Sequence, residues 1–167
     1  MGTRGLKGFV VNGEVKACYN HDDSYPSGLG TEVCEWLAEE IGFGREDEIR
    51  KMAADLRTVD EWDNEVTYSS AGLGEILDSG IIPDGADFAA DSLFCEWAYL
   101  VNFDERVVEV YQGFARSPHS DGRFASETAN DSDFYPIRLV ATYGFDVLPD
   151  KAELLEFGST REGAVEV

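Results

Sequence analysis

Alternating hydrophobic and polar positions open the chain. Two such runs, residues 6–11 and 14–20, flank Asn12-Gly13, a dipeptide typical of the tight type I′ turn of a β-hairpin. Alternation divides the second run into two faces, one with Val15, Ala17 and Tyr19 and the other with Lys16, Cys18 and Asn20. The pattern therefore predicts an antiparallel hairpin.

The next segment changes to a helical period. Val33, Trp36, Leu37 and Ile41 form one apolar stripe, which predicts a helix over residues 31–41 with Thr31 as its N-cap. Further helices are predicted over residues 45–58, 70–79 and 150–157.

The second half of the chain returns to strand-like patterns. Residues 92–103 and 107–114 predict another hairpin, and residues 136–145 predict one more strand. The polar stretch 117–133 predicts a long loop that is either functional or mobile. Because hairpins replace the β-α-β alternation of parallel sheets, the expected fold class is α+β, a mostly antiparallel sheet built from hairpins with helices packed on one face.

The chain length of 167 residues fits one domain, which we place at residues 1–158, followed by a flexible tail over residues 159–167. No apolar run reaches the ~18 residues of a membrane span, and no secretory leader pattern is present, so a cytoplasmic protein is expected. The cysteines Cys18, Cys34 and Cys95 lack metal-site spacing and lie among apolar residues. They are expected to be buried free thiols.

The charge is strongly negative. Thirty-four acidic residues against 13 basic ones give a formal net charge of −21. Such a charge opposes binding to nucleic acid or to an anionic membrane, and it favours a basic partner protein. The alternative interpretation is a lineage whose proteins are all acidic, in which case the charge serves solubility alone.

Candidate chemistry is concentrated in "YNHDDSYPSGLG", residues 19–30. An imidazole such as that of His21 is the side chain best suited to acid–base chemistry at neutral pH, and carboxylates stand beside it in the sequence. Catalytic groups must converge from separate segments, and Arg4, Glu96 and His119 are the possible further contributors. The candidate catalytic set is His21, Asp23, Ser24, Tyr25, Arg4 and Glu96, and the candidate ligand-binding set is Arg4, Asn20, His21, Asp23, Ser24 and Tyr25.

A purely structural turn is an equally good interpretation of these residues. Asp22 and Asp23 favour Asx turns, and Gly28 and Gly30 relax the backbone before the helix. The spacing supports no metal site, no cofactor is expected, and the helix start "SGLGT" lacks the lysine of a phosphate-binding loop. We predict that Arg4 or His21 hydrogen-bonds Asp23 or Tyr25 and anchors the turn.

Three blocks resemble a known family: "MGTRG" at the start, "YNHDDSYPSGLG", and "CEWAYLVNFDERVVEVYQG" at residues 95–113. They are similar to blocks in a family of uncharacterised proteins from bacteriophages, other large viruses and some microbial eukaryotes. The family has no named activity. The resemblance implies one shared feature made by Arg4, Asn20, His21, Asp23, Ser24, Tyr25 and Glu96.

The function expected from the sequence is that of a virus-related accessory protein in the host cytoplasm. It would bind a basic host protein through an acidic surface over residues 32–65. The alternative is a small hydrolase-like enzyme, or a small-ligand-binding protein, with a pocket around residues 19–30.

Overall fold

Five strands form the central sheet, in the order β2-β1-β5-β6-β7. The computed structural model describes residues 3–60, 71–126, 129–130 and 132–162. The strands are β1 (Gly5–Val11), β2 (Glu14–Asn20), β5 (Trp97–Asn102), β6 (Val107–Gln112) and β7 (Arg138–Gly144). Neighbouring strands are antiparallel except for the central pair β1 and β5, which is parallel. The two predicted hairpins are confirmed, and they lie side by side.

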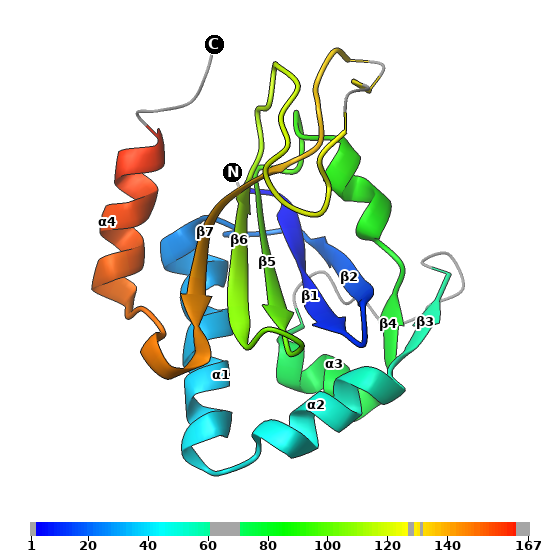
Figure 1. Ribbon diagram of the computed structural model, residues 1–167, viewed down its shortest axis with the longest axis vertical. Helices are drawn as coiled ribbons and strands as arrows, with labels where there is room; N and C mark the ends of the chain where they lie inside the picture. The colour runs from blue at the N-terminus through cyan, green and yellow to red at the C-terminus, as the bar shows by residue number, and fades with distance from the viewer. Residues whose placement is uncertain (1–2, 61–70, 127–128, 131, 163–167) are drawn as a thin grey trace.

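In the described part of the chain, four helices pack their apolar residues into one core with the sheet. They are α1 (Thr31–Gly42), α2 (Glu46–Asp55), α3 (Leu73–Ser79) and α4 (Lys151–Glu162). Phe9 and Val11 of β1 and Tyr99 of β5 belong to this core, together with Leu37 of α1 and Ile76 of α3. Figure 1 shows α1 behind the sheet and α4 at the left beside β7, with α2 and α3 near the lower end of the sheet. The fold is α+β, as the sequence predicts.

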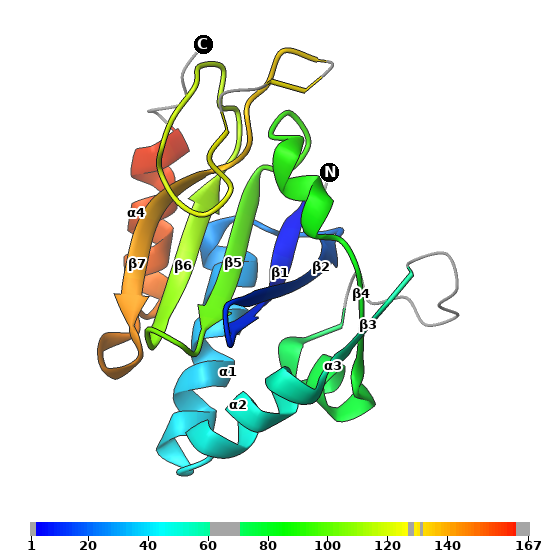
Figure 2. The same cartoon turned by 45° about the vertical axis from the view of Figure 1, so that its right-hand side comes forward.

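The opposite face of the sheet is covered without long helices. A second core of residues such as Leu6, Val10 and Leu100 lies there, under the short 3₁₀ helix Ala86–Ala90 and the long loop that leads to β7 (Figure 2). Arg123 from this loop donates to the buried carboxylate of Glu109 at 2.6 and 2.8 Å. The predicted long loop is therefore fixed to the sheet at this point.

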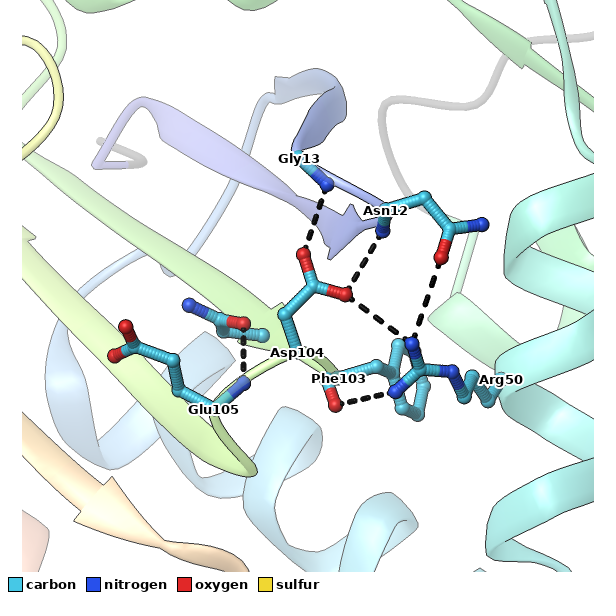
Figure 3. Close-up of polar contacts among 7 residues, drawn as sticks. Asn12, Gly13, Arg50, Phe103, Asp104 and Glu105 are labelled. Atoms are coloured by element: carbon cyan, nitrogen blue, oxygen red, sulfur yellow. Dashed lines mark hydrogen bonds and ion pairs between the residues drawn. The ribbon is translucent and has the colours of Figure 1, made fainter.

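The turns of the two hairpins are joined to each other and to α2 (Figure 3). Asp104 accepts hydrogen bonds from the backbone nitrogens of Asn12 and Gly13, both at 2.8 Å. These bonds help to hold the pKa of Asp104 below its ordinary value. Arg50 of α2 donates to the backbone oxygen of Phe103 at 2.7 Å. Because Asn12 and Gly13 both have positive φ, the type I′ geometry exposes their N–H groups to this carboxylate.

Several predicted boundaries are wrong. Thr31 is not an N-cap, because a π-helical turn, Pro26–Gly30, runs directly into α1 and the Thr31 hydroxyl donates back to Pro26 at 3.4 Å. Helix α4 continues to Glu162, so residues 159–162 are helical rather than a tail, and residues 163–167 lie outside the described residues. The structure also has a two-stranded parallel sheet, β3 (Arg57–Val59) with β4 (Ile81–Pro83), that the sequence pattern did not predict.

Candidate functional site

The "YNHDDSYPSGLG" segment is a closed turn held by two buried polar side chains. Asn20 ends β2, and its Nδ2 atom donates to the backbone oxygen of Asp22 at 2.7 Å and to Oγ of Ser24 at 2.8 Å. The backbone oxygen of Ser24 accepts a hydrogen bond from the Tyr99 hydroxyl at 2.8 Å. The backbone nitrogen of Ser24 donates to the backbone oxygen of Thr3 at 3.2 Å. The side chain of Ser24 is 0% exposed. Its hydroxyl is therefore engaged and shielded rather than available as a nucleophile.

The glycines of the segment serve close packing. A Cβ atom on Gly28 would lie 2.3 Å from the backbone oxygen of Asp23, and one on Gly30 would lie 3.0 Å from the Tyr99 ring. Asp23 itself has φ 53°, in the left-handed region that Asp tolerates better than most residues. Its carbonyl accepts a bond from Leu29 at 2.8 Å. Glycine at positions 28 and 30 and aspartate at position 23 are therefore residues that this tight turn can accommodate.

The other candidate residues of the segment point to the surface. His21, Asp23 and Tyr25 are exposed, and Nδ1 of His21 lies 2.9 Å from the Tyr19 hydroxyl. The charge of Asp23 raises the pKa of Tyr25. His119 lies in the long loop, where Nε2 donates to a backbone oxygen at 2.7 Å. These groups do not converge with His21 on one point.

Arg4 and Glu96 make contact with each other rather than with the turn. The backbone nitrogen of Arg4 donates to Oε2 of Glu96 at 3.2 Å, and the Arg4 guanidinium lies 5.4 Å from the centre of the Phe94 ring. Among the described residues, no hydrogen bond joins Arg4 or His21 to Asp23 or Tyr25. The predicted anchor is therefore wrong, and Asn20 and Ser24 hold the turn instead.

A buried lysine beside this turn is the strongest candidate for a functional side chain. Lys7 lies in the middle of β1, on the helix-covered face of the sheet, and is 1% exposed. Its Nζ atom donates to Oδ1 of Asn20 at 2.9 Å. An ammonium group has three N–H donors, and within the described part of the chain Asn20 is its one hydrogen-bond acceptor. Two of its three donors therefore have no acceptor among the described residues.

Lys16 is a second buried lysine, and its contacts are those of a structural residue. Lys16 is 6% exposed on the same face of neighbouring β2. Its Nζ atom donates to the backbone oxygens of Ala53, Ala54 and Leu56, at 2.8 to 3.0 Å. These are the free carbonyls at the C-terminus of α2, where a cation also complements the helix dipole. Lys16 is fully used by the fold, whereas Lys7 is not.

Lys7 lines a pocket between α1 and the start of α3. The cavity has a volume of about 200 Å³. Leu29, Val33, Trp36 and Leu73 form its apolar walls, with Gly72 and Gly74 beside them, and Glu32 and Glu75 complete the lining. A cavity of ~150 Å³ is sufficient to bind benzene, so this one has room for a small organic molecule.

The charges around this pocket oppose one another. Burial lowers the pKa of Lys7 from its ordinary value, and interactions with Cys18, Glu32 and Glu75 offset part of that shift. Glu32 and Glu75 are both exposed, so they lie at the solvent side while Lys7 lies inside. The pocket therefore combines a buried ammonium with carboxylates at its mouth.

Sequence reasoning missed Lys7, although a signal was present. The chain has only four lysines, and two of them interrupt strand patterns: Lys7 stands between Leu6 and Gly8, and Lys16 between Val15 and Ala17. Alternation placed Lys16 on the face of Cys18 and Asn20, which is the helix-covered face. Lysine is seldom buried, so a lysine at an inward position of a strand indicates a specific role, either in binding or, as at Lys16, in the structure.

The remaining chemistry of the described residues is limited. All three cysteines are buried and free, as predicted. Within these residues no group of three or more His, Cys, Asp or Glu side chains is placed to hold a metal ion, and no helix is long and apolar enough to cross a membrane.

Exposed carboxylates occur on every part of the described surface rather than on one element. They include Glu14, Asp22, Glu35, Glu48, Asp78, Asp87, Asp121 and Glu156. This wide distribution is what a solubility role predicts. Residues 61–65 of the predicted acidic surface lie outside the described residues.

Comparison with protein-family models, with curated proteins and with solved structures gives no match. The family resemblance of the three sequence blocks therefore stays a prediction, and the functional argument depends on the geometry of the site.

Proposed function

We propose that this protein binds a small molecule in the pocket between α1 and α3, with Lys7 as the central binding residue. The observation that carries the proposal is the state of Lys7: it is 1% exposed, has one hydrogen-bond acceptor among the described residues, and lines a cavity of about 200 Å³. A buried cation with unused donors is unfavourable unless a ligand supplies the missing acceptors.

The turn at residues 19–30 belongs to this site as its support. Oδ1 of Asn20 accepts the bond from Lys7, while Nδ2 of the same side chain is held by Asp22 and Ser24. Asn20 therefore fixes the direction of the ammonium group. Leu29, from the end of the same turn, forms part of the pocket wall. This arrangement favours the ligand-binding alternative over the hydrolase-like one, because Ser24 is buried.

Intrinsic fluorescence gives a direct test. Trp36 lines the pocket, so binding should change its emission. We would titrate small carboxylates and amino acids into the wild type, Lys7→Met, Lys16→Met and Trp36→Phe. The expected result is a saturable change in the wild type and Lys16→Met that is absent from Lys7→Met and Trp36→Phe. If no compound gives such a change, or if Lys7→Met responds like the wild type, the proposal is wrong.

Binding of a basic protein is a second candidate function. Glu32, Glu35 and Glu39 are exposed on one face of α1, at helical spacing. In contrast, the half-buried Glu40 of the same helix is paired with Arg45 at 2.8 Å. Charge reversal of the three exposed acids, with Glu156 of α4 as the control position, should abolish capture of a basic partner if this face is the docking surface. Binding that does not weaken between low and physiological salt would exclude it.

A further inference from the structure

The charges that line the pocket also indicate the class of ligand. We infer that the pocket binds a small zwitterion of the amino-acid class, with its carboxylate on Lys7, its ammonium near Glu32 and Glu75, and an apolar side chain against Trp36 and Leu73. This inference rests on the proposed function and specifies its ligand.

The first step is the position of the opposite charges. Lys7 is buried within the pocket, whereas Glu32 and Glu75 line the same pocket from exposed positions on α1 and α3. The carboxylates are therefore the more exposed charges of the lining, and the ammonium group is its buried charge. A simple anion would be attracted by Lys7 but repelled by the two carboxylates. A simple amine would be attracted by the carboxylates but repelled by Lys7. A zwitterion complements both signs.

The second step is that all three charged groups, Lys7, Glu32 and Glu75, belong to the lining of one small pocket. Consistent with this, both carboxylates act to raise the pKa of Lys7. In an amino acid the two charged groups are separated by a single carbon atom. A compact zwitterion can therefore contact Lys7 and a carboxylate at the same time.

The third step is the fit of the remaining space. The walls are apolar and aromatic, from Leu29, Val33, Trp36 and Leu73, and the volume is about 200 Å³. Gly74 allows the wall to close tightly, since a Cβ atom there would lie 2.8 Å from Nε1 of Trp36. An aliphatic side chain of the size of leucine suits such a cavity, while a drug-sized ligand needs ~300 Å³ or more.

Four matched probes test this inference on the full chain. They are L-leucine, 4-methylpentanoate (leucine without its amino group), isoamylamine (leucine without its carboxylate) and isoamyl alcohol (without either charge). Dissociation constants would be measured by Trp36 fluorescence and checked by calorimetry. We expect leucine to bind at least about tenfold more tightly than any of the other three.

Two carboxylate variants separate this inference from the proposed function. Glu32→Gln and Glu75→Gln should reduce the preference for leucine over 4-methylpentanoate to near unity, while Glu39→Gln, outside the pocket lining, should leave it unchanged. Equal binding of leucine and 4-methylpentanoate to the wild type would overturn the zwitterion and leave the proposed function intact. If none of the four probes binds, the zwitterion is also overturned, and the wider titration of carboxylates then decides the proposed function separately.

Discussion

Replacing Lys7 by methionine distinguishes a binding lysine from a structural one. Methionine keeps the apolar length of the side chain but removes the charge. The structure shows one bond to lose, from Nζ to Oδ1 of Asn20 at 2.9 Å, and an acceptor left without its donor costs about 1–3 kcal/mol. Folding of the variant no longer desolvates an ammonium group, a penalty of several kcal/mol for a buried ion. The second effect should equal or exceed the first.

We therefore expect Lys7→Met to have the same free energy of unfolding as the wild type, or one that is higher by up to about 2 kcal/mol. Urea unfolding followed by circular dichroism measures this difference. Lys16→Met is the matched control. Its free energy of unfolding should fall by about 3 kcal/mol, because the loss of three charge-assisted bonds of ~1.5–3 kcal/mol each outweighs the several kcal/mol regained when no ammonium group is desolvated. A loss of more than about 2 kcal/mol in Lys7→Met would refute the reasoning, because Lys7 would then be structural.

The pH dependence provides a second readout of the same substitution. Burial lowers the pKa of Lys7 below its ordinary value of 10.5. Between these two pKa values the unfolded chain binds more protons than the folded chain, so the stability of the wild type rises with pH relative to Lys7→Met. The difference in unfolding free energy between the two proteins should therefore narrow as the pH approaches 10.5. A difference that stays constant from neutral pH upwards would contradict a desolvated ammonium.

Three further substitutions test the description of the fold. Burial raises the pKa of Cys34 from 9.0 to about 12, so above pH 9.0 the thiol ionises in the unfolded chain before it ionises in the folded chain. Relative to Cys34→Ala, the wild type should therefore lose about 1.4 kcal/mol of unfolding free energy per pH unit, as measured by urea titrations under reducing conditions. Parallel pH dependences of the two proteins would contradict this. Glu109→Gln should lower the free energy of unfolding by about 2–4 kcal/mol, because Asn102, Tyr111 and Arg123 all donate to its carboxylate, although an ion pair with the exposed Arg123 stabilises less than a fully buried pair. The control substitution, Glu105→Gln, should change the free energy of unfolding by less than about 0.5 kcal/mol. Equal effects of the two substitutions would exclude the proposed role of Glu109. Gly28→Ala should lower the melting temperature and cost about 2 kcal/mol of unfolding free energy, since the new Cβ atom would lie 2.3 Å from the Asp23 backbone oxygen. The control Gly42→Ala, with open space around it, should stabilise the protein by about 0.4–1 kcal/mol. An unchanged melting temperature in Gly28→Ala would contradict the tight packing described for this turn.

Local patterns were sufficient to predict most elements of the fold. The Asn12-Gly13 turn, both hairpins and the stripes of α1 and α2 follow from short-range chemistry that the structure confirms. The parallel pairing of β1 with β5 depends on two segments about ninety residues apart, which no local period encodes. The strands β3 and β4 have three residues each, which is too short for an alternating pattern of apolar and polar residues to be recognised.

The site was harder to predict, for a different physical reason. Side-chain chemistry alone favours His21, Asp23 and Tyr25, which the fold leaves exposed. It also favours Asn20 and Ser24, which the fold buries as supports of the turn. Lys7 looked ordinary in sequence because its chemistry comes from burial and from α3, a helix more than sixty residues away. The environment that makes a lysine functional is a tertiary property.

Asn20 connects the turn that the sequence singled out with the lysine that it missed. Lys7 can only donate a hydrogen bond, and the backbone oxygen of Asp22 can only accept one, so the two neighbours fix which end of the Asn20 amide faces each of them. The amide group is thereby fully oriented without any ligand. If the turn were the functional centre, this orientation would serve only to close it. The oxygen end instead accepts a hydrogen bond from a buried cation at the wall of a pocket, so the closed turn also holds Lys7 in position.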